Sequence, residues 1–290
     1  MTAAPPLSLD HVGFMVRDLD AAVARWERLG FLLSRRSPQM GKVPGESEMA
    51  PWASSNHCAM FEHGYLELIG ITNPENFNPW SRFLDRFEGP HITALRCENG
   101  EEAYKALSGR IDHFDPPLQR LRNAPYGDGV REFRFRNIFS QDDHYPEGRY
   151  IIIEHQTPEV IWQDELMVQP NGAIEFAELV FCADTGDDLL DRLSRISGDD
   201  ALDTEAGGFI ELSGGGSLSV LSEAAFGRRY EGASIPPRPA VAAAVIQVRD
   251  LGALKNLLAD NGVTPIIRSS KSLWVSPEDG NGAVIEFIEA

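Results

Sequence analysis

The sequence predicts an α+β protein built from four βαβββ modules, which form two domains whose mixed sheets wrap around a cleft. Three observations predict this fold class. The 290 residues amount to about twice the usual length of one domain, roughly 150 residues. The composition, 42% hydrophobic and 24% charged, is typical of a folded globular chain. One order of elements, a strand, a helix and then further strands, recurs four times along the chain.

The first module is expected between residues 8 and 72. Residues 8–18 alternate apolar and polar side chains as a strand does, and the following helix is expected over 19–29 because apolar residues recur there at helical spacing. Gly30 ends the helix. A Pro/Gly-rich loop is expected at 38–51, and the remaining strands are expected at 32–37, 57–63 and 65–72.

The other three modules repeat this order. In the second we expect a strand at 91–99, a helix at 100–109 and strands at 130–139 and 149–155. The third has its strands at 174–184, 207–212 and 216–222 and its helix at 185–197; the fourth has strands at 240–250, 264–270, 272–276 and 283–290 and a helix at 251–262. Residues 157–173 read as a linker, so the predicted domains are 1–165 and 172–290.

Charge and composition exclude several classes of partner. The chain has 26 basic and 44 acidic residues, a net charge of -18, which argues against nucleic acid and anionic membranes. No apolar run approaches the roughly 18 residues of a membrane span, and the N-terminal residues do not resemble a signal peptide. We therefore expect a cytoplasmic protein with a small-molecule substrate, and pairing into a homodimer stays open. The widely spaced cysteines predict buried, reduced thiols: Cys58, Cys97 and Cys182.

The histidines point to a site in the N-terminal half, since all seven lie within the first 155 residues. His11 precedes Asp18 by seven residues and His91 precedes Glu98 by seven, so both sit at the same place in the first strand of their module. A single strand histidine is usually structural, but a matched pair favours metal ligands. The same counting in the last two modules gives residues that cannot bind a metal, Ala177 and Ala243.

Two stretches of the first module carry a family resemblance: DHVGFMVRDLDAA opens it and GYLELIG closes it. Together with the later Thr157-Pro158-Glu159 and Trp162, they resemble the vicinal oxygen chelate superfamily of glyoxalases, bleomycin resistance proteins and extradiol dioxygenases, and within it the glyoxalase-like proteins. The resemblance covers essentially the whole chain and is strongest in the first module.

The resemblance implies that paired modules hold one divalent metal ion, each supplying one ligand from its first strand and one from its last. His11, Glu67 and His91 map onto three of these positions, and either Glu154 or His155 onto the fourth. Imidazoles and carboxylates suit zinc, iron(II), nickel, cobalt or manganese. Because Glu154 and His155 are adjacent in a strand, only one of them can face the metal. The C-terminal domain has lost its ligands in this interpretation.

The remaining candidates would contact the substrate. His57 lies in a strand of the first module, and Arg134 and Arg136 share one face of residues 130–139, where they could bind an anionic group. A solvated edge strand explains these arginines equally well. The long loop at 38–51 is a possible lid over the cleft.

The predicted activity is that of a metal-dependent lyase or isomerase. It would act on a small, oxygen-rich substrate through an enediolate-type intermediate, with Glu67 or Glu154 moving the proton. Two alternatives stay open: an extradiol-type ring-cleaving dioxygenase, and a metal-free protein that sequesters a small ligand.

Overall fold

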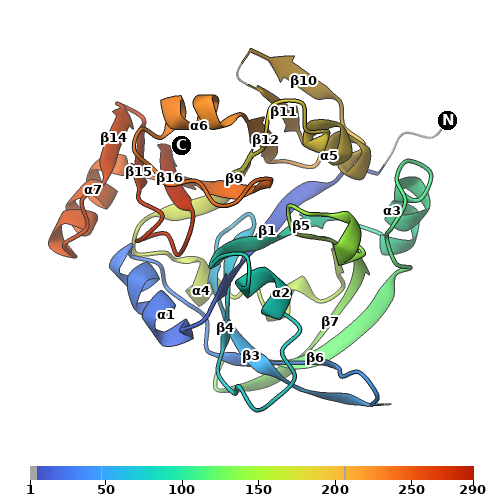
Figure 1. The fold of residues 1–290 in the computed structure, drawn as a ribbon. Coiled ribbons are helices and arrows are strands. Elements are labelled where there is room, and N and C mark those ends of the chain that lie inside the picture. Colours follow the sequence, from blue (N-terminus) through green and yellow to red (C-terminus); the bar gives the residue numbers. More distant parts are fainter. Residues whose placement is uncertain (1–4, 47, 206) are drawn as a thin grey trace.

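The computed structural model describes residues 5–46, 48–205 and 207–290 and contains two eight-stranded mixed sheets (Figure 1). The first sheet takes its strands from the N-terminal half, in the spatial order β2-β3-β4-β1-β5-β8-β7-β6. Its strands are β1 (Ser8–Val16), β2 (Ser37–Lys42), β3 (Met49–Met60), β4 (Tyr65–Ile71), β5 (Gly89–Arg96), β6 (Leu118–Tyr126), β7 (Gly129–Phe139) and β8 (Arg149–His155).

The second sheet has the same layout, β10-β11-β12-β9-β13-β16-β15-β14, and belongs to the C-terminal half. Its strands are β9 (Ala173–Cys182), β10 (Ala201–Thr204), β11 (Gly207–Glu211), β12 (Ser217–Leu221), β13 (Ala240–Val248), β14 (Ile266–Ser269), β15 (Ser272–Val275) and β16 (Val284–Glu289). In both sheets the first strands of two modules pair antiparallel at the centre, and each pairs parallel with the last strand of its own module. The predicted fold class is confirmed.

One main helix follows the first strand of each module: α1 (Leu19–Arg28), α3 (Gly100–Leu107), α5 (Leu189–Ser197) and α7 (Leu251–Asp260). Three of these helices have an N-cap residue whose side chain accepts hydrogen bonds from backbone N–H groups of the first turn: Asp18, Asn99 and Asp250. Each buries one apolar face, as α1 does with Leu19, Ala22 and Trp26. Short helices α2 (Ser81–Leu84), α4 (Asp164–Met167) and α6 (Glu223–Arg229) complete the fold.

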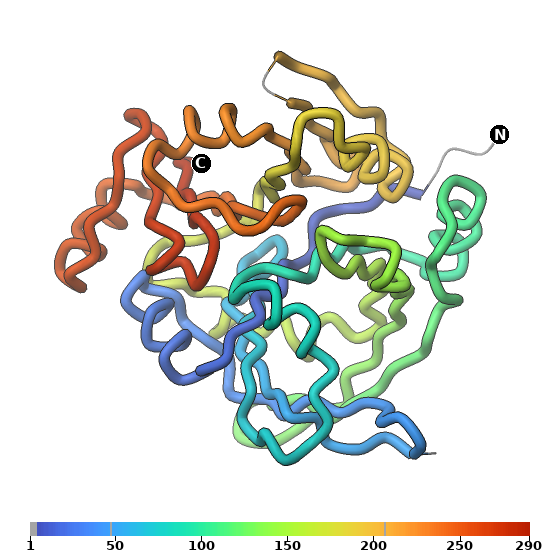
Figure 2. Tube along the Cα trace, viewed as in Figure 1, coloured from blue at the N-terminus to red at the C-terminus, as the bar shows by residue number. Residues whose placement is uncertain are grey.

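The two halves lie side by side and share one hydrophobic core (Figure 2). Phe31 and Phe287 stack with ring centroids 6.0 Å apart, and Arg28 of α1 donates to the carbonyls of Asn261 and Gly262 after α7. The segment predicted as a linker is also fixed in place, because the Gln169 side chain accepts from the Leu32 N–H and donates to the Leu32 carbonyl oxygen. The described residues include no helix long and apolar enough to cross a membrane.

Most differences from the predicted strands fall at the edges of the sheets or next to them. β2 and the first residues of β3 lie in the segment expected to be a loop at 38–51, while Leu33 makes only an isolated bridge. β6 and β10 were not expected, and neither was α6. Edge strands carry polar side chains on exposed faces, so the apolar alternation that identifies a central strand is weak there.

Candidate active site

The first sheet curls into an incomplete barrel around a cavity of about 550 Å³. The wall includes side chains from the central strands and from both edge strands. The two edges approach each other through side chains: Arg122 of β6 donates to the Ser37 hydroxyl of β2 at 2.8 Å. A smaller cavity of about 190 Å³ adjoins it, and Tyr65 and Glu67 line both. The predicted cleft is therefore present in the N-terminal half.

His11 lines this cavity because of an irregularity in β1. The pairing with β5 shifts between Leu9 and His11, which leaves Asp10 as an extra residue in a β-bulge. Bulges re-aim neighbouring side chains. Here the result is that two consecutive residues contact each other: the Asp10 carboxylate lies 2.6 Å from Nδ1 of His11.

Asp10 connects two buried histidines. Its second oxygen lies 2.9 Å from Nε2 of His155, and the Asp10 side chain is only 1% exposed. Burial opposes ionisation, yet the two histidines outweigh it and hold the pKa of Asp10 well below its usual range. An ionised carboxylate can only accept hydrogen bonds, so Nδ1 of His11 must be a donor. Neutral His11 therefore keeps the lone pair of Nε2 free.

Nε2 of His11 faces Glu67, whose Oε2 lies 3.8 Å away. Asn56 donates to the other oxygen of Glu67, and Tyr65 stacks on the His11 ring at 4.4 Å with an interplanar angle of 16°. Burial, together with Asp10 and Glu67, raises the pKa of Tyr65 well above its ordinary value, so its hydroxyl stays protonated. The cavity thus brings together a base, a carboxylate and a phenol.

His91 does not join this group. Its Nε2 lies 3.0 Å from the carbonyl oxygen of Phe87, and its ring packs against Phe83 and Phe87, 1% exposed. Burial lowers the pKa of His91 to about 4. The pairing shift in β5 leaves His91 as the extra residue of a second bulge, so its structural counterpart in β1 is Asp10.

The count that matched His91 to His11 was off by one, because the N-cap residue of α3 is Asn99 and not Glu98. His11 precedes the N-cap Asp18 by seven residues, and Ile92 precedes the N-cap Asn99 by seven. The register agrees: His11 pairs with Ala94 as Ile92 pairs with Gly13. Ile92, which lines the cavity, thus occupies the position expected of the second histidine.

The last strands give the same result. Glu67 pairs with Gly13 in β1, and the equivalent residue in β8, paired with Ala94, is Ile151. His11 and Glu67 of the first module are therefore faced by two isoleucines, Ile92 and Ile151, in the second. Among the described residues, no three His, Cys, Asp or Glu side chains are arranged to hold a metal ion. The residues present do not fit the predicted four-ligand set.

The two adjacent candidates in β8 point to opposite faces, as expected. The Glu154 carboxylate accepts from Gly100 N at the start of α3 and from Arg136 at 3.2 Å, outside the cavity. The His155 side chain is fully buried between Asp10, Phe133 and Trp162. Neither is brought to Glu67.

The expected substrate contacts lie elsewhere too. His57 bonds the Ser34 carbonyl at 2.7 Å, and Arg134 is 55% exposed beside Glu132. In β7 it is Phe133 and Phe135 that face the cavity, and their partners in β6 are Arg122 and Arg120. Sequence reasoning missed these two arginines. The only sequence signal was the alternation Arg120-Leu121-Arg122, and the structure shows that the two arginines are half-buried while Leu121 is 66% exposed.

The C-terminal sheet holds a closed version of the same arrangement. The bulge in β9 falls on Ala177, so Glu178, and not Ala177, corresponds to His11; it pairs with Ser217 as His11 pairs with Tyr65. Glu286 of β16 corresponds to Glu67. Arg229 of α6 lies between them, with its Nη2 2.7 Å from Glu178 Oε2 and 2.8 Å from Glu286 Oε2. The guanidinium of Arg229 thus occupies the space between the two residues that correspond to His11 and Glu67.

Comparison with known structures agrees with the fold. A hypothetical protein from Staphylococcus aureus matches with a TM-score of 0.65 and 10% identity, covering 98% of this chain and 99% of its own. A mutant of 4-hydroxymandelate synthase from Streptomyces coelicolor matches with a TM-score of 0.60 and 13% identity, covering 98% and 93%. The 2,3-dioxygenase LapB from Pseudomonas sp. KL28 gives 0.56 and 8%, covering 99% and 94%.

No curated protein matches the sequence. A family model described as a glyoxalase-like domain matches residues 9–197, which include the whole N-terminal sheet and the start of the second. Each of the solved structures covers nearly the full chain at low identity, so they show the fold alone. On the family match, the chain belongs to the glyoxalase-like domain family of the vicinal oxygen chelate superfamily.

Proposed function

We propose that the N-terminal cavity is the active site of a small-molecule isomerase or lyase in which His11 is the general base. The observation that carries this proposal is the Asp10–His11 pair. Asp10 fixes the Nδ1–H tautomer of His11 and leaves Nε2 as a proton acceptor on the cavity wall. The family's enediolate chemistry needs such a base beside the carbon atom that loses its proton.

The proton transfer uses this chain's own residues. Nε2 of His11 takes a proton from the carbon next to a substrate carbonyl, and the resulting imidazolium lies between the carboxylates of Asp10 and Glu67. The Tyr65 hydroxyl, which forms no hydrogen bond within the described chain, donates to the negative oxygen that develops on the substrate. Return of the proton to the neighbouring carbon, with the proton of the substrate hydroxyl passing to the former carbonyl oxygen, completes an isomerisation.

The side chains at the four expected ligand positions argue against the predicted dependence on a metal ion. Relatives in the superfamily commonly bind a divalent ion, but here two of the four positions hold Ile92 and Ile151. Extradiol chemistry at iron(II) needs two histidines and a carboxylate, whereas the described cavity wall has one histidine, His11, and one carboxylate, Glu67. The same isoleucines favour the second candidate, a protein that binds a small ligand without turnover.

Proton exchange separates these functions. A panel of hydroxyketones and 2-oxo acids is incubated in D₂O with protein treated with EDTA, and loss of the C–H signal is followed by NMR. We expect exchange by the wild type, a loss of roughly 10² to 10⁴-fold in His11→Asn, and a smaller loss in Asp10→Asn. His57→Asn, outside the cavity, is the matched control and should exchange at the wild-type rate.

Two outcomes would overturn the proposal. If no member of the panel exchanges although several bind, the protein is a binding module. If exchange needs added Mn²⁺, Zn²⁺ or Fe²⁺, and His11→Asn and Glu67→Gln lose a stoichiometric metal by elemental analysis, the reaction depends on a metal after all.

A further inference from the structure

The cavity contains two cations without an anionic partner, Arg120 and Arg122. Arg122 donates to the Ser37 hydroxyl and lies over the Phe133 ring at 5.6 Å, while the nearest polar contact of Arg120 is the Met49 sulfur at 3.8 Å. Within the described part of the chain neither forms an ion pair. Burial lowers the pKa of Arg120, the expected effect of an uncompensated charge.

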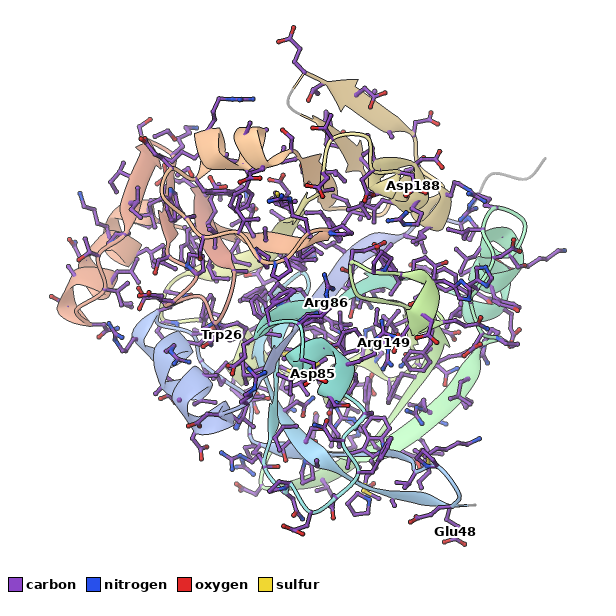
Figure 3. All side chains as sticks on the ribbon, viewed as in Figure 1. Trp26, Glu48, Asp85, Arg86, Arg149 and Asp188 are labelled. Carbon is purple, nitrogen blue, oxygen red and sulfur yellow. The ribbon has the colours of Figure 1, made fainter. Side chains whose placement is uncertain are left out.

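The contrast with neighbouring arginines is informative. Arg149, which lines the same cavity next to α2 (Figure 3), is neutralised by Asp142, which accepts from its Nε at 2.8 Å. Arg136, on the outer face of the sheet, is paired with Glu154. In a chain with a net charge of -18, carboxylates are abundant, yet none of the described ones reaches Arg120 or Arg122. These guanidinium groups remain available to a bound anion.

Apolar side chains make up much of the remaining wall. Four aromatic rings line the cavity, those of Trp52, Trp80, Phe133 and Phe135, and all but Phe133 pack in one hydrophobic cluster with four lining isoleucines: Ile69, Ile92, Ile151 and Ile153. Phe133 and Phe135 stack with centroids 4.6 Å apart. A volume of about 550 Å³ falls within the range of small-molecule sites. Such a wall stabilises a flat apolar body by removing it from water.

We propose that Arg120 and Arg122 bind the anionic group, a carboxylate or a phosphate, of a substrate whose apolar, flat body lies against these aromatic rings and isoleucines. This inference rests on the proposed function, because it assigns the substrate class of the same cavity. Arg122 joins β6 to β2 through Ser37, so the anion binds at the seam of the barrel. His11, on the central strand β1, then acts on the part of the substrate that lies deeper.

Calorimetric titration with three probes of one shape tests this: benzoate, phenyl phosphate and neutral benzamide. We expect at least one of the two anions to bind the wild type ten or more times more tightly than benzamide, and the ratio of the two anions identifies the preferred group. Arg122→Gln and Arg120→Gln should each lower the affinity for the anion about tenfold and leave benzamide unchanged. Arg134→Gln, on the outer face of the next strand, is the matched control.

The proposal is overturned if benzamide binds as tightly as both anions, or if the double variant Arg120→Gln/Arg122→Gln keeps wild-type affinity for them. Arg122→Lys keeps the positive charge but loses the planar guanidinium, so it should bind the anion with intermediate affinity. This variant shows whether a loss of binding in Arg122→Gln comes from the lost charge or from misfolding. His11→Asn should bind the anions normally. Failure of proton exchange with intact anion binding would therefore sink the proposed function and leave this inference standing.

Discussion

Removing the guanidinium of Arg229 should strongly destabilise the protein. In the wild type Arg229 forms a two-point contact with Glu178, at 2.9 and 2.7 Å, and also bonds Glu286, whose side chain is fully buried. Arg229→Met leaves two carboxylates facing each other without a cation between them. Breaking a buried ion pair by deleting one partner costs about 3–5 kcal/mol.

Two features place the expected loss near the lower end of that range. Arg268 still contacts Glu286 at 2.9 Å, and the Glu178 and Arg229 side chains are each 18% exposed, so water relieves part of the repulsion. We expect a loss of about 3 kcal/mol in the free energy of unfolding, measured by urea denaturation at pH 7.5. The matched control is Arg268→Met, which removes a 42% exposed partner of the same carboxylate and should cost at most about 1 kcal/mol.

The pH dependence gives an independent check. Burial opposes ionisation of Glu286, but Arg229 together with the hydrogen bonds from Ser272 and Tyr230 outweighs burial and lowers the pKa below the ordinary 4.5. In the wild type this contribution to stability is present above pH 4.5 and is lost as the pH falls through the lower folded pKa. In Arg229→Met the carboxylates instead take up protons on folding, so the deficit should shrink as the pH falls.

Removing the two carboxylate charges as well should restore the stability of the Arg229→Met variant. Adding Glu178→Gln and Glu286→Gln to Arg229→Met removes the uncompensated charges and should recover most of the lost stability. If Arg229→Met costs no more than Arg268→Met, or if the triple variant is no more stable than Arg229→Met alone, the guanidinium does not hold the C-terminal sheet together as described.

Three further predictions follow from other buried groups. Because burial lowers the pKa of His91 to about 4, the unfolded chain binds its proton first and stability should fall between pH 6.5 and about 4; His91→Gln should flatten that part of the curve in urea denaturation. Glu154→Gln weakens the contacts with Gly100 N and Arg136 and should cost about 1 kcal/mol without changing proton exchange, whereas equal loss of exchange would place Glu154 in the chemistry after all. Burial raises the pKa of Cys97 to about 12, so native protein at pH 8 should react with iodoacetamide far more slowly at this thiol than protein in urea, and comparable rates would contradict its burial.

Local sequence patterns were sufficient for the central strands and main helices. β1, β5, β9 and β13 carry apolar runs, and the helices that follow have spaced apolar faces, so both could be predicted from periodicity. The edge strands β2, β6 and β10 could not, because their exposed faces carry polar side chains that hide the apolar alternation, even though each pairs with the next strand along the chain. Prediction of His11 and Glu67 as site residues depended on the matched positions of His11 and His91 and on the family resemblance, which is strongest in the first module.

The register of the second module was beyond the sequence. A single extra residue in a strand reverses which side chains face the cavity, and the bulges at Asp10 and His91 are visible only in the pairing of β1 with β5. The count of seven residues started from Glu98 and not from the N-cap Asn99, and it therefore predicted His91 as the ligand where the structure places Ile92.

The amino-acid sequence by itself determined the class of fold, the order of its modules and the half of the chain that carries the histidines. Only the tertiary structure decided which side chains meet: Asp10 with two histidines, Arg229 between two glutamates, and Arg120 and Arg122 with no carboxylate of the described chain beside them. The physical reason is that periodicity records the environment of each residue one strand at a time, whereas contacts across strands depend on register, which a single bulge resets.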